Sequence, residues 1–382
     1  MILSKRKIIF LTGTRADFGK IKSLLQILQH SEDFEPYIFV TGMHMLQKYG
    51  YTLIEVENSG FKNIETFQNF TDETTMDLTL AKTIEGFSSY IKKVKPDMIV
   101  VHGDRVEALA GAIVGSLNNI LVSHIEGGEI SGTIDELIRH SVSKMSHLHF
   151  VSNKEAAKRL LQMGEVPESI FTIGSPDIDI MFSDKLPSLK DVKSYYEIKF
   201  ENYGIAMFHP VTTEIEYIEL YARDFVKALV KSDKKFVVIY PNNDLGSSKI
   251  IKCYDEISSN SNFRILPSLR FEYFLTLLKN ANFIIGNSSA GIREAPYYGV
   301  PTINIGTRQA NRAVHSHIIH TDYEYESILK TISLNFEKIC IDHKLFGAGD
   351  SATQFLKNLS SQKIWDINHQ KQFREYEFSK KS

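Results

Sequence analysis

The stretch Val101-His102-Gly103-Asp104-Arg105, followed further along the chain by His124-Ile125-Glu126-Gly127-Gly128-Glu129-Ile130-Ser131-Gly132-Thr133-Ile134-Asp135-Glu136, decides the fold. Each segment follows a short apolar run, Met98–Val101 in the first case and Ile120–Ser123 in the second. Such runs are typical of buried strands in a parallel sheet, and ligands bind at the carboxyl ends of those strands. We therefore expect one crevice to collect the side chains of His102, Asp104, His124 and Glu126. A buried core disfavours unpaired charges, so this clustering favours ligand binding or catalysis.

Strand-like and helix-like segments alternate along the chain, which predicts parallel sheets with helical crossovers. The strands expected in the first half are Lys7–Thr12, Tyr37–Thr41, Met98–His102, Leu121–His124, His149–Ser152 and Ile170–Ile173. After a polar break, the strands expected in the second half are Gly204–Phe208, Phe236–Tyr240, Phe263–Leu266, Phe283–Ile285 and Thr302–Ile305.

This pattern predicts an α/β protein with two Rossmann-like domains, residues 1–180 and 203–360, joined by a linker at 181–202. A substrate is expected in the cleft between them. We expect a final helix, over about 361–382, to pack back on the first domain.

Composition excludes several classes of protein. The 382 residues carry a net charge of −2, which gives no basic field for nucleic acid or an anionic membrane. Cys253 and Cys340 lie far apart and indicate neither a disulfide framework nor a zinc site. Because no apolar run approaches a membrane span and no signal peptide is evident, we expect a cytoplasmic protein. We expect no metal and no other cofactor.

Two loops at strand ends have the composition of anion sites. Gly13-Thr14-Arg15-Ala16-Asp17-Phe18-Gly19 opens a helix, but it is not GxGxxG and does not indicate dinucleotide binding. In Asn287-Ser288-Ser289-Ala290-Gly291-Ile292-Arg293-Glu294, backbone N–H groups and the two serine hydroxyls can surround a diphosphate. Glu294 can then hold a ribose through its diol. The alternative for each loop is a plain helix start with a polar cap.

Further candidates follow other predicted strands. Arg308, in Gly306-Thr307-Arg308-Gln309, and nearby Arg312 suit phosphate recognition. His209, in His209-Pro210-Val211-Thr212-Thr213, ends the first strand of the second domain and would face the carboxylates of the first. His44 ends another strand of the first domain, although a single histidine is often only structural.

The acids in these motifs are Asp104, Glu126, Glu129, Asp135 and Glu136. Proton transfer near neutral pH needs carboxyl groups whose surroundings separate their pKa values. Asp135 and Glu136 also have a plain structural interpretation, since acids in the first turn of a helix complement its dipole.

Taken together, GTRADFG (13–19), HGDR (102–105), HIEGGEISGTIDE (124–136), HPVTT (209–213), NSSAGIRE (287–294) and GTRQ (306–309) resemble the bacterial hydrolysing UDP-N-acetylglucosamine 2-epimerases of sialic-acid biosynthesis. They are also similar to the epimerase part of the bifunctional animal enzyme. The resemblance implies a GT-B-like pair of domains and the conversion of UDP-N-acetylglucosamine and water into N-acetylmannosamine and UDP. It implies anti elimination of UDP to a 2-acetamidoglucal, followed by hydration.

The resemblance places Asp104, Glu126, Asp135 and His209 at catalytic positions. Asp104 and Glu126 would be the acid/base pair at C1–C2, Asp135 would act in hydration, and His209 would meet the diphosphate or the leaving oxygen. The expected substrate contacts are Arg15, Asp17, His44, Arg105, Ser288, Ser289, Gly291, Glu294 and Arg308. Gly19 stands where some relatives carry a serine that touches phosphate. A homodimer or homotetramer is the implied assembly.

Four alternatives stay open at this point. The sugar nucleotide could be GDP-N-acetylglucosamine, as in legionaminic-acid pathways, with Phe271 or the stretch 240–244 near the base. The others are a non-hydrolysing epimerase, a retaining GT-B glycosyltransferase and a non-catalytic nucleotide-sugar sensor. The sensor is disfavoured because an anionic ligand gains nothing from extra carboxylates without proton chemistry.

Overall fold

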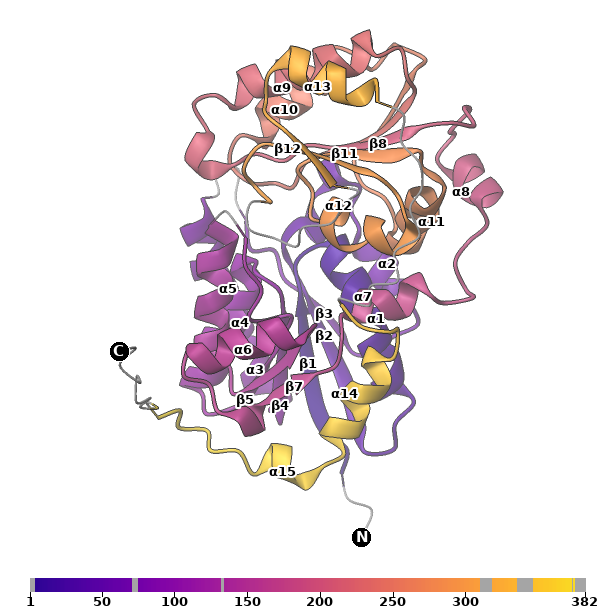
Figure 1. Cartoon of the computed structure of the whole chain (residues 1–382). Coiled ribbons are helices and arrows are strands. Elements are labelled where there is room, and N and C mark those ends of the chain that lie inside the picture. The colour runs from indigo at the N-terminus through magenta and orange to yellow at the C-terminus, as the bar shows by residue number, and fades with distance from the viewer. Residues whose placement is uncertain are drawn as a thin grey trace.

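The computed structural model describes residues 4–70, 75–131, 134–309, 318–334, 346–372 and 374. Figure 1 shows two α/β lobes, one above the other, with the N-terminal half of the chain in the lower lobe. The described strands form two parallel sheets, which confirms the predicted fold class. Cys340 and Arg312 lie outside the described residues.

The first lobe is built on a sheet with the order β3-β2-β1-β4-β5-β6-β7. Its strands are β1 Arg6–Thr12, β2 Phe34–Val40, β3 Ile64–Thr66, β4 Met98–His102, β5 Leu121–Ile125, β6 Leu148–Val151 and β7 Ile170–Thr172. The helices of this half are α1 Arg15–Gln29, α2 Leu53–Glu57, α3 Met76–Val94, α4 Val106–Leu117, α5 Ile134–Met145, α6 Lys154–Gln162 and α7 Pro176–Met181.

The second lobe repeats this plan with the order β10-β9-β8-β11-β12-β13. Its strands are β8 Gly204–Met207, β9 Phe236–Ile239, β10 Phe263–Leu266, β11 Phe283–Gly286, β12 Thr302–Ile305 and β13 Ile318–Thr321. Its helices are α8 Leu189–Tyr195, α9 Ile218–Lys231, α10 Ser247–Asp255, α11 Phe271–Asn280, α12 Ala290–Arg293 and α13 Tyr325–Ile332.

The apolar pattern explains why these segments pack as they do. The central strands are apolar throughout and buried on both faces, as β4 is from Met98 to Val101. Helix α1 buries a stripe that includes Phe18, Ile21 and Leu24, and Thr14 caps its start by accepting a hydrogen bond from the Asp17 N–H. The start of α1 is therefore fixed at the carboxyl end of β1.

The chain order reverses direction in the middle of each sheet. In the first lobe β1 lies between β2 and β4, and in the second β8 lies between β9 and β11. The loops after such neighbouring strands diverge to opposite faces and leave a crevice, which is the usual ligand site of this architecture. The structure thus has two such crevices, one in each lobe.

The C-terminal segment differs from the prediction. Helix α14, Ser351–Leu359, was assigned to the second domain, but Phe355 and Leu359 are buried in the core of the first lobe. The following helix, α15, spans only Gln362–Trp365, and its Ile364 joins the same core. Figure 1 shows both helices along the lower lobe. Helix α14 packs against α1, so the chain returns to the first lobe earlier than expected.

The predicted linker is partly a packed element. Its short helix, α8, buries Val192 in an apolar cluster with Leu275 and Ile284 of the second lobe. Ile178 and Met181 of α7 join that cluster too, while α7 also contacts α1. The α7 segment therefore lies between the lobes. No helix within the described ranges is long and apolar enough to cross a membrane.

Candidate active site

A cleft of about 200 Å³ lies where the crevices of the two sheets face each other. The loops after β1, β4 and β5 form its first-lobe wall, and the loops after β8, β9, β11 and β12 form the opposite wall. The first lobe contributes Thr14, Ala16, Asp17, Lys20, His102, Gly103, Asp104, Arg105, Glu126, Ser131, Asp135 and Arg139. The second lobe contributes Met207, His209, Asn242, Ser288, Ser289, Arg293, Arg308 and Gln309.

The ends of β4 and β5 carry the polar residues that drew attention in the sequence. The strands pair in register, with His102 opposite Ile125, so Asp104 and Glu126 follow adjacent strand ends. Glu126 adopts φ +64°, a left-handed conformation that non-glycine residues rarely take. Such strain persists only where the surroundings enforce it, and it concentrates at functional sites.

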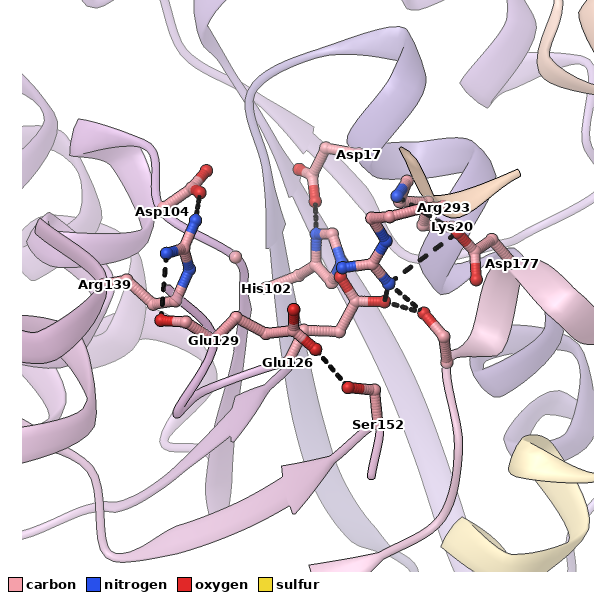
Figure 2. A network of polar contacts seen from close by, with 12 residues as sticks. Asp17, Lys20, His102, Asp104, Glu126, Glu129, Arg139, Ser152, Asp177 and Arg293 are labelled. Carbon is pink, nitrogen blue, oxygen red and sulfur yellow. Dashed lines mark hydrogen bonds and ion pairs between the residues drawn. The ribbon is translucent and has the colours of Figure 1, made fainter. Parts of the chain in front are cut away.

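A dense ionic network surrounds Glu126, as Figure 2 shows. Arg293 of α12 pairs with Oε1 of Glu126, and the hydroxyl of Ser175 donates to the same oxygen. Lys20 bridges Asp177 at 3.1 Å and Glu294 at 3.2 Å. Burial alone would raise the pKa of Glu126, but Arg293, Lys20 and His102 hold it well below its ordinary value.

A second pair of acids has the opposite character. Asp104 forms an ion pair with Arg139, and Oδ2 of Asp135 lies 3.3 Å from Nη2 of Arg308 in the other lobe. Burial, and then the nearby charge of Asp104, raise the pKa of Asp135 despite that arginine. One carboxyl group of the cleft is thus held ionised while another is pushed towards protonation.

His209 is fixed by its neighbours in one tautomer. Its Nδ1 accepts a hydrogen bond of 3.2 Å from the Asn242 N–H, so the neutral ring carries its proton on Nε2. Burial, followed by the charges of Arg308 and Arg105, holds the pKa of His209 well below its usual range. The ring is therefore a neutral hydrogen-bond donor.

Asn287 holds the second-lobe wall together. Its Oδ1 accepts from the His209 N–H at 2.7 Å, and its Nδ2 donates to the His209 carbonyl at 2.8 Å. The Asn287 carbonyl accepts from Arg308 at 3.2 Å and from Gln309 at 2.9 Å. The side chain and the main-chain carbonyl of this one buried residue thus connect the sequence motifs at 209–213, 287–294 and 306–309.

All residues predicted as catalytic line the cleft, namely Asp104, Glu126, Asp135 and His209. The predicted substrate contacts that line it are Asp17, Arg105, Ser288, Ser289 and Arg308. Arg105 crosses to the second lobe, where it contacts Asn243 at 2.9 Å and Asp244 at 3.2 Å. Asn242 of the 240–244 stretch faces the cleft as well.

The other predicted substrate contacts are Arg15, His44, Gly291 and Glu294, and none of them is among the lining residues. Arg15 pairs with Glu55 and donates to the Ser268 hydroxyl at 2.8 Å, so it joins the lobes beside the cleft. A Cβ at Gly291 would lie 2.6 Å from Thr302, so this glycine permits close packing of α12 on β12. Glu294 acts on the cleft through Lys20.

Two histidines at strand ends are buried structural groups. His44 contacts the hydroxyls of Thr12 at 3.2 Å and Thr52 at 2.8 Å, and burial lowers its pKa to about 4. His124, which we expected in the crevice, contacts the Ser143 hydroxyl at 3.0 Å and the Gly103 carbonyl at 2.8 Å. Burial lowers its pKa to about 3. Both rings are buried, and their contacts fix neighbouring segments of the first lobe rather than reaching the cleft.

Three groups of the network were not predicted as site residues: the buried Asp177 and Arg293, and Lys20, whose side chain is 12% exposed. Arg293 ends α12 and stands inside a motif that the sequence had indicated, whereas Lys20, in the second turn of α1, has no such local signal. Asp177 follows β7, and the rule that drew attention to β4 and β5 applies to it too. Across the described ranges, no group of three or more His, Cys, Asp or Glu residues has the arrangement of a metal site.

Comparisons with known proteins agree with this geometry. A family model described as UDP-N-acetylglucosamine 2-epimerase matches residues 26–365. A UDP-N-acetylglucosamine 2-epimerase of Neisseria meningitidis serogroup B is 48% identical over 373 residues, covering 96% of this chain and 98% of that protein. A Legionella pneumophila protein named UDP-N,N'-diacetylbacillosamine 2-epimerase (hydrolyzing) is 35% identical, covering 87% of this chain and 90% of that protein.

A solved structure supports the fold. The crystal structure of Methanocaldococcus jannaschii UDP-GlcNAc 2-epimerase in complex with UDP-GlcNAc and UDP matches with a TM-score of 0.78. The match is 21% identical in sequence and covers 93% of this chain and 99% of that one. The family match over most of the sequence is decisive: the chain belongs to the UDP-N-acetylglucosamine 2-epimerase family.

Proposed function

We propose that this protein is a hydrolysing UDP-N-acetylglucosamine 2-epimerase, which converts UDP-N-acetylglucosamine and water into N-acetylmannosamine and UDP. The product would be the aminosugar from which sialic acid is built. The observation that carries the proposal is the pair Glu126 and Asp135, two carboxyl groups in one cleft whose pKa values are displaced in opposite directions. Such a pair is what acid/base chemistry at a carbon centre requires.

The first step removes a proton from C2 and breaks the C1–O bond to UDP. Glu126, held ionised by Arg293 and Lys20, is the proton acceptor. The bond electrons pass from C2–H into a C1–C2 double bond, and UDP leaves with the C1–O pair. The departing diphosphate develops charge, which Arg105, Arg308 and the neutral Nε2–H of His209 are placed to stabilise.

The second step adds water across the double bond. Hydroxide goes to C1. A proton goes to C2 on the face opposite to the one that lost the first proton, and this inverts C2. Asp135 is the group whose raised pKa suits it to hold and return a proton, with Asp104 beside it. No electrons leave the substrate overall, so the proposed reaction calls for no redox cofactor.

The test is proton NMR of the reaction in deuterated water with UDP-N-acetylglucosamine. We expect free N-acetylmannosamine carrying deuterium at C2, together with one equivalent of UDP. Epimerised sugar still bound to UDP would identify a non-hydrolysing enzyme, and tight binding without turnover would identify a sensor. Parallel reactions with GDP-N-acetylglucosamine and UDP-N,N'-diacetylbacillosamine, the substrate in the name of the Legionella relative, decide the nucleotide and the sugar.

The residue assignment has its own test. Glu126→Gln should leave UDP binding largely intact and lower turnover by about 10²-fold or more, because the proton acceptor is gone. Glu219→Gln is the matched control, since Glu219 is an exposed residue of α9 paired with Arg223. Wild-type turnover in Glu126→Gln would remove Glu126 from the mechanism.

A further inference from the structure

His102 lies between two acids of the cleft, and the proposed reaction assigns it no part. His102 is the last residue of β4, and its side chain is only 8% exposed in the wall of the cleft. Its Nδ1 lies 2.8 Å from Oδ1 of Asp17, and its Nε2 lies 3.2 Å from Oε2 of Glu126. Figure 2 shows the ring between the two acids.

The chemistry of these neighbours fixes the protonation of the ring. An ionised carboxylate only accepts hydrogen bonds, and a neutral imidazole has only one N–H. Nδ1 is hydrogen-bonded to Asp17, whereas Nε2 lies at ion-pair distance from Glu126 without hydrogen-bond geometry, so it is the two carboxylate charges together that favour the doubly protonated cation. Although burial alone would lower the pKa of His102, Glu126 and Asp17 raise it to about 9.

The contact to Asp17 carries the connection further. Oδ2 of Asp17 accepts a hydrogen bond of 3.1 Å from the Gly13 N–H, in the loop after β1. A continuous line of polar contacts therefore runs from that loop through Asp17 and His102 to Glu126. Movement of the loop when a nucleotide binds would be passed to the carboxylate along this line.

Other charged groups surround the same ring. The charged ones are Lys20 on α1, Arg293 on α12 and Asp177 on α7, and His124 on β5 is a neutral neighbour. Arg293 pairs with Glu126 from the second lobe, while Lys20 of α1 pairs with Asp177 and Glu294 and acts on Glu126 only through its charge. His102 ends β4 and is paired with Ile125, the residue before Glu126, so its place beside Glu126 is set by the sheet of the first lobe.

We propose that His102 is a positioning residue for the reaction: an imidazolium that holds Glu126 ionised and aligned, and links it through Asp17 to the loop at Gly13. This inference rests on the proposed function. The two fail separately, because a wild-type protein without turnover contradicts the function, whereas an active wild type allows His102 to be judged.

The test is the pH profile of kcat/KM for the wild type and for His102→Asn. An opposite charge within a few ångströms displaces a carboxyl pKa by about 1–3 units, so the acid limb of the variant should move up by about that amount. The wild type should lose activity as the pH rises through about 9, where the ring loses its second proton, and the variant should lack this fall. A residue that only supports the fold would lower activity equally at all pH values.

Two controls keep the test decisive. His30→Asn changes an exposed histidine at the end of α1 and should leave both limbs in place. His102→Gly leaves a gap that added imidazole can fill, and imidazole should restore turnover by at least about tenfold at pH 7. Protonated 1-methylimidazole carries the same charge but one N–H, and it should not restore turnover. Unchanged pH limbs in His102→Asn, or equal rescue by both compounds, would overturn the proposal.

Discussion

Gly19 allows the sharpest test of how the lobes meet. It lies inside α1, and a Cβ built there would be 2.4 Å from Cβ and 2.5 Å from Cγ of Phe271 in the second lobe. Within the first lobe, Gly19→Ala should help α1 by about 1 kcal/mol, since alanine is the better helix former. At the contact between lobes it should cost about 1–3 kcal/mol, as overpacking does. That cost corresponds to a factor of about 5–150 in the ratio of molecules whose lobes meet at this contact to molecules whose lobes do not.

The assay compares UDP affinity by calorimetry with the radius of gyration in solution. Gly19→Ala should bind UDP more weakly and remain more extended with UDP present, while its melting temperature stays the same or rises. Phe271→Gly removes the opposing Cβ and ring, so the alanine should cost little in that background. An equal loss of affinity in both backgrounds would refute the reasoning, because the effect would not come from this contact.

Two further outcomes are expected. Asn287→Ala removes two hydrogen bonds to the backbone of His209, and the loss of each costs about 1–3 kcal/mol. Because His209 would then be held less firmly, kcat/KM should fall by at least about fivefold. Full activity in steady-state kinetics would contradict this expectation. Burial would raise the pKa of Glu165, but the hydrogen bond from His149 and the charge of Lys371 lower it to about 2. This stabilisation is complete above about pH 4.5 and disappears as the pH falls through about 2. Glu165→Gln should therefore flatten the pH dependence of the free energy of unfolding in urea within that window. If that free energy depended on pH as steeply in the variant as in the wild type, the contacts of Glu165 would not be its source.

The fold was largely predictable because its strands are buried and apolar. Met98–His102, Phe263–Leu266 and Thr302–Ile305 have the predicted bounds, since the strands end sharply at a polar residue, a proline or a glycine. The short strands β3 and β13 were not predicted because they lie at sheet edges and carry mixed residues. The predicted domain boundaries placed residues 351–359, which form α14, in the wrong lobe. An amphipathic face shows that a helix packs, not against which lobe.

The candidate site was predictable to the level of loops. Strand ends identified the cleft, but the sequence does not tell which side chain at a strand end turns inwards, and His44 and His124 turn into the core. Arg15 was expected at the diphosphate and instead pairs with Glu55, a residue on a helix that the sequence pattern did not indicate. Lys20 acquires its role only from tertiary neighbours, which no local pattern records.

The return of α14 to the first lobe has a practical consequence. The polypeptide passes between the lobes twice, so after a single protease cut in the first passage the second lobe would still be joined covalently to α14, which packs in the first lobe. A fragment ending at residue 181 would lack Phe355 and Leu359 and would expose the apolar groove that they fill. Expression of such a fragment should therefore yield a poorly folded product that aggregates. The first lobe should be studied with residues 346–372 supplied as a second peptide.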